Sequence, residues 1–208
     1  MGSMLAYKEP VLKKRLAYST VSQVSSILFG LSVLEPTAFV GALSHIVFHS
    51  LIKNALFLCA GVVIVITGWK RVSETKGLGK VMPVTLACYT AVSLGLVGIP
   101  PFSGFVSKWY LASGALASAA GPWCYIGPVV LLISALLTAG YLLPMSIQGF
   151  LPGEEFDDGI LKSRNLLKRE PDFKMLVPIG ILTAGTLWFG LFPGSLIQML
   201  ERISAMVF

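Results

Sequence analysis

An apolar stretch from Ala42 to Ile66 contains three ionisable residues, and this combination constrains the chain more than any other feature. The stretch is long and apolar enough to cross a lipid bilayer as a helix. Its ionisable residues are His45, His49 and Lys53, which follow one another at steps of four. Because four residues turn about 400° around a helix, the three side chains share one slanted stripe roughly 12 Å long. We call this stripe the His–Lys ladder.

The His–Lys ladder has the chemistry to move a proton. Ionisable side chains inside a membrane are expensive unless they face the protein interior or a wet cavity, and they are then candidates for function. Histidine titrates near neutrality, and a lysine reached by water can take up and release a proton. The structural alternative is that the three side chains only hold helices together by hydrogen bonds. That role does not require the ammonium group of Lys53.

The composition indicates an all-α membrane protein that crosses the bilayer several times. Of the 208 residues, 55% are hydrophobic and 12% are charged, whereas a soluble domain carries about a quarter charged residues. The net charge of +6 comes from short basic clusters between apolar runs, as expected for cytoplasmic loops. We therefore expect an integral protein of a prokaryotic inner membrane, in contact with the lipid bilayer, with cytoplasmic basic loops and no nucleic-acid partner.

Nothing in the sequence predicts a cofactor or a metal site. Cys59, Cys88 and Cys124 lie singly in apolar segments, without the spacing of a metal or redox pair. The chain has no nucleotide-binding glycine-rich loop and no flavin motif. We read the cysteines as small buried hydrophobic residues.

The hydropathy pattern predicts a single transmembrane domain over residues 1–208 with about five spans. Residues 1–7 look like the end of a helix that begins outside the chain, residues 151–174 form a polar loop, and residues 195–208 suit a short amphipathic helix at the membrane interface. The predicted spans are residues 16–34, 37–68, 82–119, 123–150 and 175–192.

The span at 82–119 is interrupted at Gly98–Gly104, where two prolines between glycines cannot continue a helix. It is either one broken span or two short spans. The number of membrane crossings favours one broken span, because a single crossing at 82–119 places all basic clusters on the same side of the membrane. The clusters are Lys13, Lys14 and Arg15; Lys70, Arg71, Lys76 and Lys80; and Lys162, Arg164, Lys168 and Arg169. The third cluster is mixed with the acids Glu154, Glu155, Asp157 and Asp158, which count for little in this rule.

Lys108 follows this break and is a second candidate for ion chemistry. Irregular backbone inside a membrane is tolerated only in protein or beside a wet cavity, and discontinuous helices build ion sites. Near the break, Lys108 can find water and carbonyl groups. The alternative is a lysine that extends to the membrane surface beside Trp109 and Tyr110.

Three motifs resemble the antiporter-like membrane subunits of respiratory complex I, Mrp-type sodium/proton antiporters and membrane-bound hydrogenases. The first, over residues 12–23, reads LKKRLAYSTVSQ. The second is the His–Lys ladder followed by ALFLCAG at 55–61. The third combines KGLGKVMP at 76–83 with GIPPFSGFVSK at 98–108. Together they cover roughly residues 12 to 118.

The resemblance implies a fold and a set of roles. Its members have about fourteen helices in two inverted repeats of five, each with a broken helix, and a row of Lys, His and Glu at mid-membrane. Lys53 matches the central lysine, His45 and His49 match residues that connect water to it, and Lys108 matches the terminal ionisable residue. The chain is similar to the second half only. We therefore expect a fragment, a split-gene product or a partial sequence.

The favoured hypothesis is a proton-translocating membrane subunit, with sodium as an alternative coupled ion. Its setting would be an NADH dehydrogenase- or hydrogenase-type complex, or an Mrp-type antiporter, where it would be a translocase subunit among other membrane subunits and hold no redox centre. The alternative is a truncated structural or assembly subunit without transport activity. A third reading, an unrelated secondary transporter with a site at its broken helix, fits the three motifs poorly.

Overall fold

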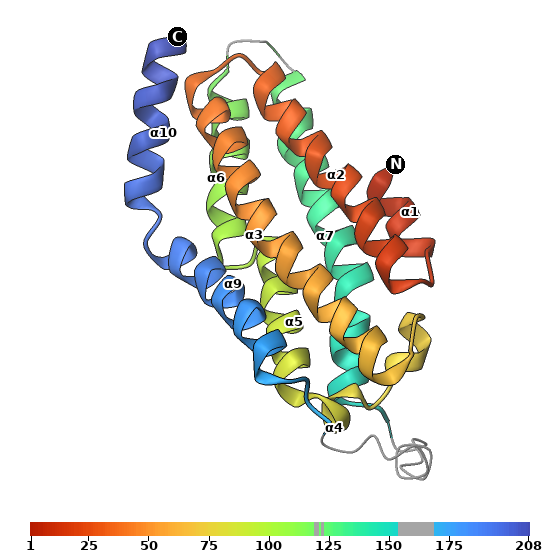
Figure 1. Ribbon diagram of the computed structural model, residues 1–208. Helices are drawn as coiled ribbons and strands as arrows, with labels where there is room; N and C mark the ends of the chain where they lie inside the picture. Colours follow the sequence, from red (N-terminus) through yellow and green to blue (C-terminus); the bar gives the residue numbers. More distant parts are fainter. Residues whose placement is uncertain (119–120, 122, 154–168) are drawn as a thin grey trace.

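The computed structural model describes residues 1–118, 121, 123–153 and 169–208. It is the all-α membrane bundle that the sequence predicts (Figure 1). The helices are α1 (Gly2–Lys8), α2 (Leu12–Ser32), α3 (Pro36–Thr67), the short 3-10 helix η1 (Val72–Thr75), α4 (Leu78–Val81), α5 (Pro83–Val97), α6 (Ser103–Ala117), α7 (Trp123–Phe150), α9 (Phe173–Leu191) and α10 (Gly194–Val207).

The longest helix, α3, carries the His–Lys ladder and has clear signals at both ends. Glu35 caps its first turn by accepting a hydrogen bond from the backbone N–H of Ala38 at 2.9 Å, and Pro36 occupies the first helical position. The helix ends at Thr67, and the next residue, Gly68, has a left-handed φ of 75°. The 32 residues of α3 span about 48 Å, which is longer than a straight crossing needs.

The predicted broken span is present as α5 and α6, which follow one another along the height of the bundle (Figure 1). Each has 15 residues, about 22 Å, which is too short to cross a membrane alone. The break is narrow because Gly104 at the start of α6 lies directly on the backbone of Gly95 in α5.

Hydrogen bonds join the segments that carry the basic clusters at one end of the bundle. Leu12 donates to the carbonyl of Lys70 at 2.9 Å, which joins the start of α2 to the loop after α3. Glu170, just before α9, accepts from the backbone N–H of Val84 at 2.6 Å and from the hydroxyl of Thr85 at 2.9 Å. The contacts of Glu170 place the later end of the predicted 151–174 loop near the start of α5, as one broken span requires. The charged residues of that loop outside the described part of the chain are Glu154, Glu155, Asp157, Asp158, Lys162, Arg164 and Lys168.

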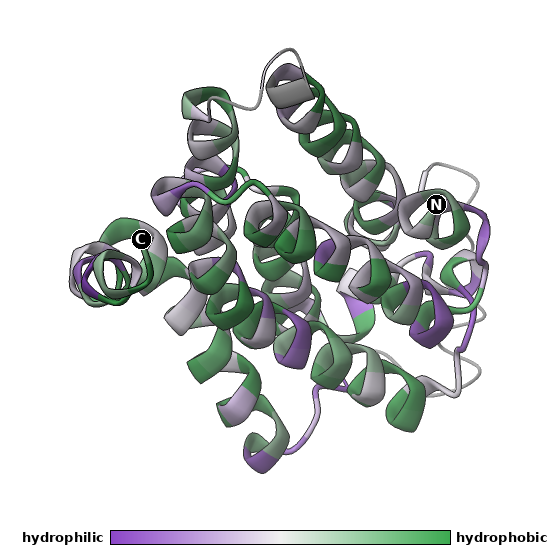
Figure 2. Ribbon diagram, turned by 90° about the horizontal axis from the view of Figure 1, so that it is seen from above, coloured by the Kyte–Doolittle hydropathy of each residue, from purple (hydrophilic) through white to green (hydrophobic). Residues whose placement is uncertain are grey.

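The outer surface of the bundle suits lipid. Among the described residues, three helices are long and apolar enough to cross a membrane: α3, α7 over Tyr125–Phe150, and α9. Seen from above, hydrophobic residues are distributed over all the helices (Figure 2). On α7 the exposed apolar residues include Val129, Val130, Leu132, Ile133 and Leu136. Such a surface is unsuited to water, and the chain is an integral membrane protein.

Two helices, α2 (Leu12–Ser32) and α10 (Gly194–Val207), start before the residues at which the sequence predicts them to start. The first predicted span starts at residue 16, but α2 starts at Leu12, because Pro10 lies outside the helix and the basic residues occupy its first turn. Lys13 and Lys14 point outward while Arg15 is buried. The predicted 195–208 helix corresponds to α10, which packs on α3 through Val40. Its location at the membrane interface stays a prediction.

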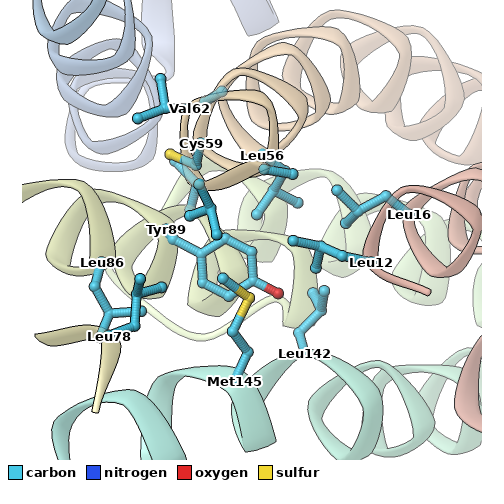
Figure 3. Close-up of a cluster of buried hydrophobic side chains, with 14 of the residues drawn as sticks. Leu12, Leu16, Leu56, Cys59, Val62, Leu78, Leu86, Tyr89, Leu142 and Met145 are labelled. Atoms are coloured by element: carbon cyan, nitrogen blue, oxygen red, sulfur yellow. The ribbon is translucent and has the colours of Figure 1, made fainter. Parts of the chain in front are cut away.

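The main apolar core lies where α2, α3, α5 and α7 meet (Figure 3). Ten of its residues are Leu12, Leu16, Leu56, Cys59, Val62, Leu78, Leu86, Tyr89, Leu142 and Met145. Cys59 is fully buried there, as expected for a small hydrophobic residue, and Cys88 is half-buried; both are free thiols. The side chain of Cys124 lies outside the described part of the structure.

A buried polar row as the candidate functional site

The His–Lys ladder faces the inside of the bundle. The exposed fractions are 2% for His45, 8% for His49 and 6% for Lys53. The two imidazole rings stack with centroids 5.9 Å apart and an angle of 20° between their planes. The spacing of four therefore produces a continuous stripe of polar groups inside an otherwise apolar helix.

A matching stripe on α2 faces the ladder. Ser19 and Gln23 are both buried and lie one turn apart. The side-chain oxygen of Gln23 lies 3.2 Å from Nε2 of His45. Lys53 Nζ donates to the Ser19 hydroxyl and, at 2.8 Å, to the carbonyl of Leu16. Because α2 and α3 are antiparallel, Gln23 meets His45 and Ser19 meets Lys53, so one step of four on α2 pairs with the two ends of the ladder on α3.

His45 also connects α3 to the helix after the break. Its Nδ1 lies 2.8 Å from the hydroxyl of Ser107, which is fully buried in α6. Ser107 immediately precedes Lys108 in the chain. The polar stripe therefore passes from α2 through α3 to the discontinuous span.

Lys108 turns its ammonium group back into the break. Its Nζ donates to the carbonyl of Leu96 at 2.7 Å and to the carbonyl of Val97 at 2.8 Å. These carbonyls belong to the last turn of α5, so no N–H group from a following turn of the helix is present to donate to them. A cation is favourable at this end of a helix because the helix dipole is negative there. Lys108 therefore caps the helix that the break interrupts.

His49 lies between the two lysines and is unpartnered. Lys53 and Lys108 are both within electrostatic range of its ring. Neither of its nitrogens has a hydrogen-bond partner among the described residues. A buried imidazole without partners is costly, and such groups in native structures call for an explanation. We call the seven residues of this arrangement the polar row: Ser19, Gln23, His45, His49, Lys53, Ser107 and Lys108.

The four candidate residues from the sequence thus belong to one arrangement, and three of its members were missed. Ser19, Gln23 and Ser107 are uncharged, and single serines in apolar helices are common at helix contacts. A signal for two of them was present in the first motif, since Arg15, Ser19 and Gln23 repeat at steps of four on α2. For Ser107 the only local signal is its place next to Lys108.

The chain matches the family described as NADH:quinone oxidoreductase/Mrp antiporter, TM, over residues 1–138. It is 39% identical over 202 residues to NADH-quinone oxidoreductase subunit N of Desulforudis audaxviator, covering 95% of this chain and 40% of that protein. It is 30% identical over 216 residues to Na(+)/H(+) antiporter subunit A1 of Staphylococcus aureus, covering 94% of this chain and 26% of that protein. The chain thus spans less than half the length of both relatives.

Solved structures have the same fold. The chain superimposes on a chain of the Mrp complex from Dietzia sp. DQ12-45-1b with a TM-score of 0.84 at 24% identity, covering 98% of this chain and 44% of that chain. For respiratory complex I from Thermus thermophilus the TM-score is 0.81 at 23% identity, covering 98% and 40%. The match of 138 of the 208 residues to the family decides the assignment. This chain belongs to the NADH:quinone oxidoreductase/Mrp antiporter transmembrane family.

Proposed function

We propose that this chain is a proton-translocating membrane subunit and that protons move along the polar row. The observation that carries the proposal is the continuity of the row. Lys53, His49 and His45 follow one another on α3, and Ser107 links His45 to the helix of Lys108. Burial of ionisable groups on one connected stripe is expensive in a membrane and is expected where ions move.

The arrangement suggests a role in proton transfer for each ionisable residue. Lys53 and Lys108 each hold a proton while they donate to carbonyl groups, and each can pass it on when water replaces those bonds. His49 has two free nitrogens between the lysines, so it can accept a proton on one nitrogen and release one from the other. Water that enters the break between α5 and α6 would control when Lys108 exchanges its proton.

The setting of the chain is also a proposal. The names of its relatives refer to an NADH-quinone oxidoreductase and to a Na(+)/H(+) antiporter. We infer that this chain assembles with other membrane subunits in a redox-driven complex or an antiporter. Sodium is the alternative coupled ion, by the second of those names. A prokaryotic inner membrane, with the basic loops in the cytoplasm, fits the position of the basic clusters.

The second candidate function is a structural or assembly subunit without transport activity. It is favoured by one observation: the hydrogen bonds of the row join three helices, since His45 lies within hydrogen-bond distance of both Gln23 and Ser107. In that case the polar row would serve as hydrogen-bonding contacts between α2, α3 and α6.

Lys53→Ala separates the two functions. In membrane vesicles that contain the native assembly, we expect proton translocation to fall by more than half, because the variant removes the ammonium group that bonds Ser19 and Leu16. Assembly is measured in the same vesicles, so that a lost complex is not mistaken for lost transport. Unchanged translocation by an intact assembly would leave the structural role as the explanation.

A further inference from the structure

Tyr89 carries an unpartnered hydroxyl in the middle of the main apolar core. The side chain is 1% exposed, and the hydroxyl has no hydrogen-bond partner among the described residues. Six apolar side chains around it form what we call the apolar layer: Leu12, Leu16, Leu56, Cys59, Leu142 and Met145 (Figure 3). A phenylalanine would fill the same space without a buried polar atom, so the hydroxyl is not explained by packing.

Tyr89 belongs to a polar stripe on α5 that the polar row does not include. Thr85, Tyr89 and Ser93 lie at steps of four and are all at most 1% exposed. The stripe is therefore roughly 12 Å long on one face of the helix. The hydroxyls of Tyr89 and Ser93 are close enough to interact, and neither has a partner within hydrogen-bond distance in the described part of the chain.

The two ends of this α5 stripe lead to different places. At its start, Thr85 donates to the carboxylate of Glu170 at 2.9 Å, on the side of the basic loops. Beyond its other end are the carbonyls of Leu96 and Val97, which hold Lys108. The stripe thus extends from a half-exposed carboxylate toward the break in the membrane span.

The neighbouring helix α2 gives Tyr89 a second link to the polar row. Arg15 is buried, within electrostatic range of Tyr89, and donates to the carbonyls of Glu9 and Tyr141 at 2.8 and 2.9 Å. The next residue, Leu16, packs in the apolar layer with Tyr89, and its carbonyl accepts from Lys53. Tyr89 therefore lies where the layer is flanked by a fixed cation on the loop side and by the central lysine.

From this placement we propose that the Tyr89 hydroxyl is the step by which protons cross the apolar layer between the basic-loop side and the polar row. The inference rests on the proposed function of the row. In one transfer, the phenol oxygen accepts a proton from a hydronium ion on the loop side, which becomes water, while its own O–H proton passes to a water on the row side, which becomes hydronium. At the phenol oxygen one O–H bond forms and one breaks, so the hydroxyl is restored and no charge stays on it. A phenol can act both as donor and as acceptor.

Tyr89→Phe tests this proposal because the packing explanation predicts the opposite pattern. The variant keeps the ring and removes a hydroxyl that bonds nothing, so thermal stability of the purified assembly should be unchanged or higher. Proton translocation in vesicles should nevertheless fall at least about threefold. The matched control is Thr90→Val, one residue further on α5, whose hydroxyl bonds Ser146 at 2.9 Å. That variant should lower stability but not translocation per assembled complex.

Lys53→Ala, measured in the same vesicles, separates failure of this inference from failure of the proposed function. Loss of translocation in Lys53→Ala with normal translocation in Tyr89→Phe would overturn the role of Tyr89 alone. Normal translocation in both would overturn both. Equal losses of stability and translocation in Tyr89→Phe would also overturn it, since the hydroxyl would then be a structural group.

Discussion

Lys108→Arg is expected to leave the assembly stable and to abolish proton translocation. An arginine keeps the positive charge and has several N–H groups for the carbonyls of Leu96 and Val97, so the capped end of α5 should survive. A guanidinium does not release its proton in a protein, however, so it cannot pass one to the His–Lys ladder. We expect translocation to fall by at least about tenfold, measured as proton uptake by vesicles normalised to the amount of assembled complex.

Lys108→Met is the companion variant, because it removes both the cap and the proton. It should abolish translocation as well, but it should also lower thermal stability, since two carbonyls at the end of α5 lose their donor. The pair therefore distinguishes a lysine that carries protons from one that only closes the break. Wild-type translocation by Lys108→Arg would assign Lys108 to the second role.

Gly41→Ala is expected to cause the second large effect, on the packing of α3 against α6. Gly41 lies one turn before His45 on the same face of α3, and an added Cβ would come within 2.6 Å of the backbone nitrogen of Leu111. The obstacle is backbone of α6, so it cannot swing aside as a flexible side chain would. We expect a loss of about 1–3 kcal/mol in the free energy of unfolding, as for other overpacked cores. The displaced α6 should also weaken the contact between His45 and Ser107.

The same helix offers a control for this variant. Gly61 is also in α3, and an added Cβ there meets no atom within 4 Å. Gly61→Ala should be neutral or slightly stabilising, because alanine is favoured over glycine in a helix by about 1 kcal/mol. Thermal unfolding of both variants in detergent gives the comparison. Equal stabilities would show that α6 can move away from α3 without penalty.

The sequence predicts well those features in which spacing along the chain sets position in space. A step of four fixes the shared face of His45, His49 and Lys53, since the helix geometry leaves no alternative. The break at Gly98–Gly104 was also predictable, because proline removes a backbone donor and clashes with the preceding turn. Its interpretation as one span depended on charge counting, and the contacts of Glu170 agree with it.

The partners of the ladder were harder to predict. α2 contains several serines, and only its step of four from Arg15 and Gln23 distinguishes Ser19, which bonds Lys53, from the other serines of the helix. The acceptors of Lys108 are backbone carbonyls, which every residue possesses, so no residue type marks them. Arg15 was grouped with two exposed lysines, although only its side chain turns inward. Which helices face one another is decided by tertiary packing, which a single sequence does not display.

The pairing between α2 and α3 has a mechanical consequence. Gln23 meets His45 and Ser19 meets Lys53, so two side chains one turn apart on α2 hold the two ends of the ladder on α3. A slide of α2 along α3 by one turn, about 5.4 Å, would break both contacts at once, because both join the same two helices. The two contacts therefore hold α2 and α3 in one register. A partner that pushes on α2 would either leave the central lysine undisturbed or release it together with the first histidine.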